Sequence, residues 1–149
     1  MKESQAARKD REGGWTFLET IIVMGIVLIL TGSVGLLGLR YVEKAKRVAA
    51  RASVETLVSA VQAYYFDCRQ YPTREQGLQA LWQCPVLSPV PTGWEGPYID
   101  RPVAPDPWNS RYDYLLPGPN GLPFGVVSYG ADTLPGGVGD GRDIASWQE

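Results

Sequence analysis

Histidine is absent from this 149-residue chain, and cysteine occurs only twice. The lack of histidine removes the usual general base of hydrolytic sites and the commonest metal ligand, and no nucleophile with a suitable base is visible. The chain has 14 basic and 16 acidic side chains, and a net charge of −2 does not favour nucleic acid as a partner. We therefore predict that the chain is not an enzyme and binds no nucleic acid.

Charge is also missing from one long stretch, residues 20–39. At about 1.5 Å per residue, a helix of this length covers roughly 30 Å, the thickness of a bilayer core. We therefore expect a single membrane-spanning helix. Glu19 stands at its N-terminal edge, where a carboxylate is costly in lipid unless a cation pairs with it. The position alone fits equally well an acid that simply lies among the headgroups.

Beyond Leu39 the helical pattern continues, but basic residues now alternate with apolar ones. Basic residues between Arg40 and Arg51 fit a positive-inside topology signal, but are explained more simply as an exposed helix face. Apolar residues then recur at intervals of three and four, which predicts a stripe that packs on a globular domain. The stripe consists of Val54, Leu57, Val58, Val61, Tyr64 and Tyr65. One helix is expected from about Trp15 to Phe66.

Prolines and glycines punctuate the chain from Asp67 onward, which predicts loops, one short helix and a few short strands. Thr73 is placed to cap the short helix, with Gln76 in its first turn. Residues 111–116 and 124–129 flank a Pro-Gly-Pro-Asn-Gly turn, and this arrangement predicts an antiparallel hairpin. The expected fold class is therefore α+β.

Three aspartates, Asp132, Asp140 and Asp143, lie in a glycine-rich segment near the C-terminus. Calcium takes about six to eight oxygen ligands, and glycines let a loop turn its carbonyls inward. The three carboxylates, with the carbonyls of Tyr129 and Val138, are therefore candidate calcium ligands. On its own, an acidic glycine loop is more often a solvated turn than a metal site.

The start of the chain has the layout of a processing signal. A polar segment, residues 1–14, precedes the apolar run, and the small residues stand before that run rather than after it, unlike a secretory signal. The junction reads Gly14-Trp15-Thr16-Phe17-Leu18-Glu19 and resembles a class III prepilin signal, with residues 1–14 as its leader. The resemblance implies cleavage by a prepilin peptidase between Gly14 and Trp15 and N-methylation of Trp15. It also implies pairing of Glu19 with the N-terminal amine of a neighbouring subunit, which would neutralise both charges in lipid.

Two further motifs lie in the second half of the chain. Residues 71–81 read Tyr-Pro-Thr-x-x-Gln-Gly-Leu-x-x-Leu, and residues 106–112 read Asp-Pro-Trp-Asn-x-x-Tyr. They resemble motifs of the major pseudopilin family of type II secretion systems, in which a glycine stands at the place of Asn109. Asparagine tolerates the left-handed conformation that such a turn requires. The family's calcium-loop frame, Gly-x-Asp, Gly-Gly and Asp-Ile, maps onto Gly130, Asp132, Gly136, Gly137, Asp143 and Ile144. The resemblance therefore implies calcium as a cofactor of this loop.

The resemblance covers essentially the whole chain and implies a pilin-like α+β fold. A long N-terminal helix, membrane-embedded in its first half, packs on a small C-terminal domain with a short helix, a small antiparallel sheet and a calcium-binding loop. The implied parts are a leader (1–14), a transmembrane and assembly half (15–39), an amphipathic half (40–66) and a periplasmic globular domain (67–149).

The implied function is polymerisation through the N-terminal helix into a periplasmic pseudopilus that drives export of folded proteins across the outer membrane. The implied partners are further copies of the chain, minor pseudopilins, an inner-membrane assembly platform and the prepilin peptidase, and the implied location is a single pass of the inner membrane. Two alternatives stay open: a minor pilin-like or competence-type subunit, and a non-polymerising membrane-anchored calcium-binding module. A need for Glu19 in assembly would distinguish a filament subunit from an anchored module.

The two cysteines, Cys68 and Cys84, flank the Tyr-Pro-Thr turn and the short helix. In an oxidising periplasm, a bridge closing a loop of this length would stabilise the fold by about 3 kcal/mol. A zinc site without histidine and a catalytic thiol without a basic partner are both less favoured. We therefore predict a disulfide between these two residues.

Overall fold

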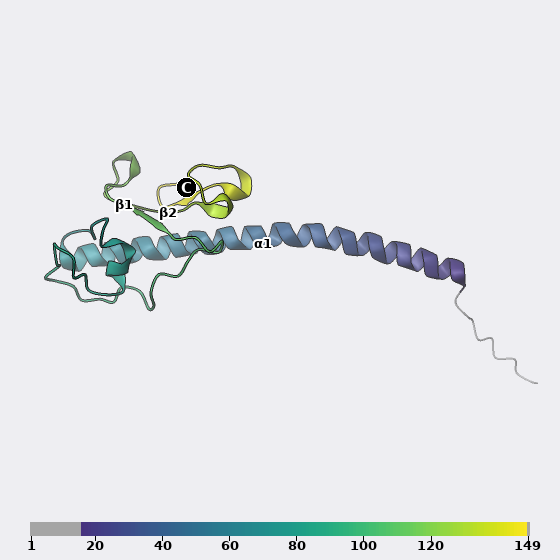
Figure 1. Ribbon diagram of the computed structural model, residues 1–149, viewed down its shortest axis with the longest axis horizontal. Helices are drawn as coiled ribbons and strands as arrows, with labels where there is room; N and C mark the ends of the chain where they lie inside the picture. The colour runs from purple at the N-terminus through teal and green to yellow at the C-terminus, as the bar shows by residue number, and fades with distance from the viewer. Residues whose placement is uncertain (1–15, 149) are drawn as a thin grey trace, which may run out of the picture. The chain divides into compact units, whose positions relative to one another are not determined.

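The structure, a computed structural model, describes residues 16–148; within them, the side chains of residues 33–39 and of Asp140 are outside the description. The chain divides into two compact units, residues 1–40 and 41–149. One long helix, α1 (Phe17–Cys68), contributes residues to both units. The remaining helices and strands belong to the second unit (Figure 1).

α1 begins at Phe17 because Thr16 caps it. The Thr16 Oγ1 accepts a hydrogen bond from the backbone N–H of Glu19 at 3.2 Å, and the Thr16 carbonyl accepts one from the N–H of Thr20 at 3.1 Å. The predicted start, Trp15, lies outside the described residues. α1 ends at Cys68, two residues beyond the prediction, because Arg69 adopts a left-handed φ of 55°.

The large apolar side chains of the first unit, between Phe17 and Leu30, are exposed in the isolated chain. Over the part of the chain that the structure describes, no helix is both long enough and apolar enough to cross a membrane. The predicted membrane segment also includes residues 33–39, whose side chains are outside the description.

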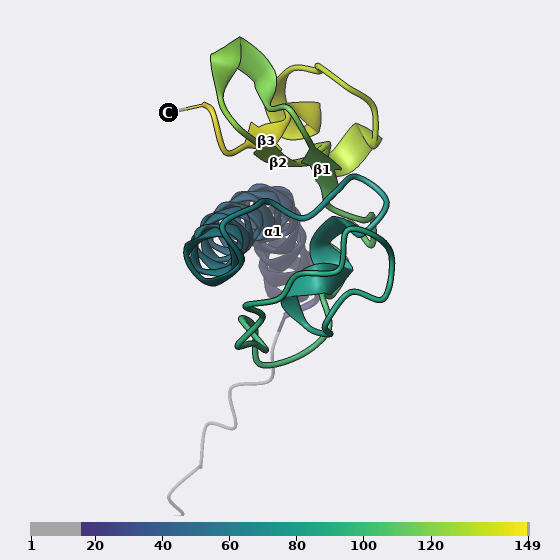
Figure 2. The same cartoon turned by 90° about the vertical axis from the view of Figure 1, so that its left-hand side faces the viewer.

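Three short strands form an antiparallel sheet in the order β1 (Asp113–Leu115), β2 (Gly125–Ser128), β3 (Ile144–Ala145). The β1–β2 pair confirms the predicted hairpin. The third strand, β3, was not predicted, because two residues carry no alternating pattern. Figure 2 looks along α1 and shows the sheet on one side of the helix, with the irregular segment that follows α1 against another side.

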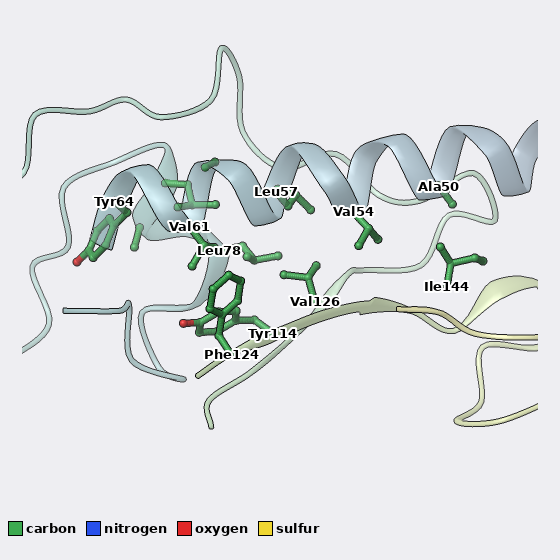
Figure 3. Close-up of a cluster of buried hydrophobic side chains, with 13 residues drawn as sticks. Ala50, Val54, Leu57, Val61, Tyr64, Leu78, Tyr114, Phe124, Val126 and Ile144 are labelled. Atoms are coloured by element: carbon green, nitrogen blue, oxygen red, sulfur yellow. The ribbon is translucent and has the colours of Figure 1, made fainter. Parts of the chain in front are cut away.

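The core of the second unit combines side chains of α1, of the sheet and of Leu78, Ala80 and Leu81; Figure 3 shows the part between α1 and the sheet. The helix contributes a stripe at intervals of three and four residues, and the sheet and the loop before β2 contribute the facing side chains. The buried residues of this contact are Ala50, Val54, Leu57, Val61 and Tyr64 of the helix, and Tyr114, Phe124, Val126 and Ile144 opposite them. Each large apolar side chain stabilises the fold by about 1.5–3 kcal/mol. Tyr65 departs from the predicted stripe, being 42% exposed and stacked on Tyr71.

The predicted short helix is a single 3₁₀ turn, η1 (Gly77–Leu81), and Gln76 anchors its start. The Gln76 Oε1 accepts from the N–H of Thr73 at 3.0 Å, while the Thr73 Oγ1 accepts from the N–H of Gln76 at 3.2 Å, so the two residues close the turn before η1 reciprocally. The Gln76 Nε2 also donates to the carbonyls of Leu87 at 2.8 Å and Pro89 at 3.0 Å. One buried amide therefore joins the turn before η1 to the loop after it.

We expect Gln76→Ala to lower the free energy of unfolding by about 2 kcal/mol, because it removes the three hydrogen bonds that the buried Gln76 side chain makes to Thr73, Leu87 and Pro89. Gln79→Ala is the matched control, since the Gln79 side chain is exposed on the same turn and its loss should change stability by less than about 0.5 kcal/mol. Urea denaturation of both variants measures the difference. Equal losses would contradict the anchoring role of Gln76.

Candidate functional site

The predicted functional residues lie in two separate places, the N-terminal edge of α1 and the loop between β2 and β3. Glu19 lies in the first turn of α1, and its side chain is exposed. The positive end of a helix dipole favours an acidic side chain there. Phe17, Leu18 and Ile22 around it are exposed apolar residues, so the start of the helix presents one carboxylate within an apolar surface. Gly14 and Trp15, the predicted processing residues, lie outside the described residues.

The second place is residues 129–143, called here the C-terminal loop. It contains two 3₁₀ turns, η3 (Gly130–Asp132) and η4 (Gly139–Gly141), which contact each other. Because β2 ends just before the loop and β3 begins just after it, the sheet holds both ends of the loop. Asp132 and Asp143 are thereby brought to the same small region.

Asp132 faces the backbone of two glycines. Its Oδ1 accepts a hydrogen bond from the N–H of Leu134 at 3.2 Å. Its Oδ2 would lie 2.7 Å from a Cβ added at Gly137 and 2.5 Å from one added at Gly141. Gly137 also has a left-handed φ of 81°, and its added Cβ would lie 2.2 Å from the carbonyl oxygen of Gly141. Glycine at these positions is therefore what lets the carboxylate approach the backbone so closely.

Asp143 binds a neighbouring glycine, Gly136, from the other end of the loop. Its Oδ2 accepts a hydrogen bond from the N–H of Gly136 at 2.9 Å. Its Oδ1 is buried, and the described residues provide no hydrogen-bond partner for it. A buried carboxylate oxygen without a donor is costly, so this atom calls for a cation or another donor. The donor chemistry of the loop thus fits an oxygen-ligated metal ion.

The other predicted ligands, Tyr129, Val138 and Asp140, belong to the same loop. The Val138 carbonyl accepts from the N–H of Gly141 at 3.2 Å. The Tyr129 hydroxyl donates to Asp113 Oδ2 at 2.9 Å; burial first, and then Asp113, raise the pKa of Tyr129 to about 12. The side chain of Asp140 lies outside the description. Among the described residues, no three His, Cys, Asp or Glu side chains lie close enough to hold a metal, so an ion here would need backbone carbonyls beside two carboxylates.

Arg47, which belongs to the basic run predicted to be an exposed face of the helix, contacts the C-terminal loop. Its Nη1 donates to the carbonyls of Gly139 at 3.1 Å and Arg142 at 3.0 Å. Sequence reasoning missed this contact because its partners lie 92 and 95 residues away, and no local pattern signals it.

The Asp-Pro-Trp motif positions the start of the loop. Buried Asp106 accepts from the N–H groups of Trp108 at 3.0 Å and Ser110 at 2.8 Å, and from the Ser128 hydroxyl at 2.5 Å. Ser128 in turn accepts from the N–H of Gly130 at 3.3 Å, the first residue of η3. Asn109 has the left-handed φ, 67°, that was expected of it. The motif therefore has a structural role, since its hydrogen bonds fix the position of the first residues of the loop.

The predicted disulfide is not formed in the structure, which holds Cys68 and Cys84 as free cysteines. The two sulfur atoms face different partners. Cys68 Sγ lies 4.0 Å from the Tyr98 hydroxyl, and Cys84 Sγ lies 4.0 Å from the Pro85 carbonyl. Burial raises the pKa of the Cys68 thiol, which favours the protonated form.

Comparison with known proteins points to one family. The family model described as type II secretion system (T2SS), protein G, matches residues 38–147. Type II secretion system core protein G of Pseudomonas aeruginosa is 32% identical over 140 residues, covering 94% of this chain and 98% of that protein. Its counterpart from Vibrio cholerae is 40% identical and covers 92% of each. The crystal structure of the major pseudopilin from the type 2 secretion system of enterohaemorrhagic Escherichia coli matches with a TM-score of 0.61 and 34% identity, over 75% of this chain and 93% of that one.

The close approach of Asp132 to Gly137 predicts different effects of alanine at Gly136 and at Gly137. Gly136→Ala and Gly137→Ala share the left-handed strain, about 1–2 kcal/mol, but only the alanine at 137 would meet other atoms. We expect Gly137→Ala to speed amide hydrogen exchange in residues 139–148 well beyond the effect of Gly136→Ala. Mass spectrometry of the exchanged peptides measures this, and identical exchange in both variants would show that the close approach is unimportant.

Proposed function

We propose that this chain, which belongs to the type II secretion system protein G family and is a major pseudopilin, polymerises through the N-terminal part of α1 into a periplasmic pseudopilus. The filament would drive export of folded proteins across the outer membrane, with minor pseudopilins and an inner-membrane assembly platform as partners. The family model over residues 38–147, together with relatives that cover 92–94% of the chain, carries this proposal. As a pseudopilin, the chain is a structural component of secretion and not an enzyme.

The surface of the first unit supports assembly through this helix. Its exposed apolar side chains require lipid or other helices to cover them, and Glu19 is the acidic residue among them. Cleavage between Gly14 and Trp15 by the prepilin peptidase would create an N-terminal amine, N-methylated on Trp15. A neighbouring subunit's amine could then pair with Glu19, and the attraction of opposite charges in a low-dielectric medium would offset their desolvation. Before assembly, the helix would cross the inner membrane once, with the second unit in the periplasm.

The second part of the proposal is a calcium ion in the C-terminal loop. Asp132 and Asp143 would hold it, helped by Asp140 and by the carbonyls of Tyr129 and Val138. Two observations support this assignment: the described residues provide no hydrogen-bond partner for the buried Oδ1 of Asp143, and Asp132 lies close to the backbone of Gly137 and Gly141. When bound, the ion would neutralise the carboxylates and join the two ends of the loop. The chain's own residues already shape the loop, through the Asp143 bond to Gly136.

We expect Glu19→Ala to abolish assembly while leaving cleavage after Gly14 intact. An unpaired amine in lipid costs about 2.5–3.5 kcal/mol, so the filament yield should fall by more than about tenfold. The measurements are the sedimentable filament fraction in cells and the mass of the processed N-terminus. Glu55→Ala removes an exposed carboxylate farther along α1, one that pairs with Arg51 at 3.2 Å, and should assemble normally. Normal filaments from Glu19→Ala would overturn this part of the proposal.

Calcium, but not magnesium, should raise the unfolding midpoint of the full chain in detergent. A concentration of 100 times the Kd corresponds to about 2.7 kcal/mol of added stability. Asp143→Ala should lose this calcium-dependent gain, whereas Asp100→Ala, which removes an exposed carboxylate outside the C-terminal loop, should keep it. Thermal unfolding with calcium, with magnesium and with chelator measures the effect. A wild-type chain that calcium does not stabilise would refute the site.

A further inference from the structure

Arg47 is the one residue of the basic run on α1 whose described bonds reach the C-terminal loop. Its Nη1 lies 3.1 Å from the carbonyl oxygen of Gly139 and 3.0 Å from that of Arg142, the residues at the start and just past the end of η4. We propose that Arg47 is a positioning residue that holds the C-terminal loop against α1 in the shape that binds calcium. The calcium half of this inference rests on the proposed function, and the tether itself does not.

The chemistry of the contact favours a tether over a chance surface contact. A guanidinium is charged at every physiological pH, and a charged donor makes a stronger hydrogen bond than a neutral one. The two accepting carbonyls are three residues apart in the loop, so one side chain fixes the whole of η4. Lysine would supply the charge as a single ammonium on a more flexible stem and would hold two carbonyls less well.

The segment between the two tethered residues, Gly139 and Arg142, lies beside both carboxylates. Gly141 lies against Oδ2 of Asp132, and Arg142 directly precedes Asp143. Fixing the carbonyls of Gly139 and Arg142 therefore restricts the backbone on which both ligands depend. A loop that is already in its bound shape loses less conformational entropy when the ion binds. Binding is reciprocal, so calcium would strengthen the Arg47 contact by the same factor.

An opposing effect is charge repulsion, since Arg47 and calcium are both cations. Substitution of Arg51 distinguishes charge repulsion from positioning. Arg51 lies one helical turn after Arg47 on α1. It lines the same cavity, of about 410 Å³, as Arg47, Arg142 and Asp143. Its described ion pair is with Glu55, at 3.2 Å. Arg51→Ala therefore removes a similar charge from the same face without removing a described bond to the loop.

The first test is amide hydrogen exchange of the full chain in detergent with a chelator present. Arg47→Ala should speed exchange of the amides of residues 141–143 by about tenfold, Arg47→Lys by less, and Arg51→Ala should leave them at the wild-type rate. These amides donate within the loop, to Val138, Gly139 and Gly136. Equal exchange in Arg47→Ala and Arg51→Ala would overturn the tether, whether or not the loop binds calcium.

The second test is calcium titration of the same variants at low and at high salt, with intrinsic tryptophan fluorescence as the readout. Arg47→Ala should bind calcium about tenfold more weakly than Arg51→Ala, with Arg47→Lys between them. Equal or tighter binding by Arg47→Ala, above all at low salt, would show that repulsion outweighs positioning and would overturn the inference. If the wild-type chain binds no calcium, the ion site and the calcium half of this inference both fail, while the exchange experiment still decides the tether.

Discussion

The packing of the α1 stripe against the three-stranded sheet is the contact on which the rest of the second unit depends. Val54 and Val61 of the helix and Val126 of the sheet are fully buried. The sheet has only nine strand residues, too few for a stable sheet without a covering surface, so the helix supplies the other half of its core. The C-terminal loop is held at both ends by strands of this sheet and therefore depends on the same contact.

Buried polar groups then determine how the irregular segments lie on that core. Gln76 joins two parts of the segment that follows α1, and Asp106 joins the Asp-Pro-Trp turn to Ser128 at the end of β2. Each is buried and satisfied by backbone or hydroxyl groups that only one arrangement of the loops brings together. Asp143 differs from them, because one of its oxygens is buried without a donor among the described residues. This difference distinguishes Asp106, whose role is structural, from Asp143, which is a candidate metal ligand.

Much of the architecture followed from local pattern. The intervals of three and four predicted the helix stripe, and the turn flanked by alternating residues predicted the hairpin that β1 and β2 form. Asn109 took the left-handed conformation that its place in the motif required. The third strand escaped prediction because Ile144–Ala145 is too short to show a period, and its pairing with β2 is a long-range contact. Cys68 and Cys84 are free cysteines in the structure, and loop length by itself does not tell where two sulfur atoms point.

The sequence by itself determined the elements and the chemical types of the candidate ligands, since helix period, turn residues and carboxylates near glycines are local properties of the chain. It also placed Glu19 at the start of an apolar helix. Tertiary structure decided which of these residues meet. Only folding brings Asp132 to Gly137 and Gly141 and Asp143 to Gly136, and it buries one Asp143 oxygen for which the described residues provide no donor. Only folding brings Arg47 to carbonyls more than ninety residues away, because such contacts depend on how the helix and the sheet pack and leave no periodic trace in the sequence.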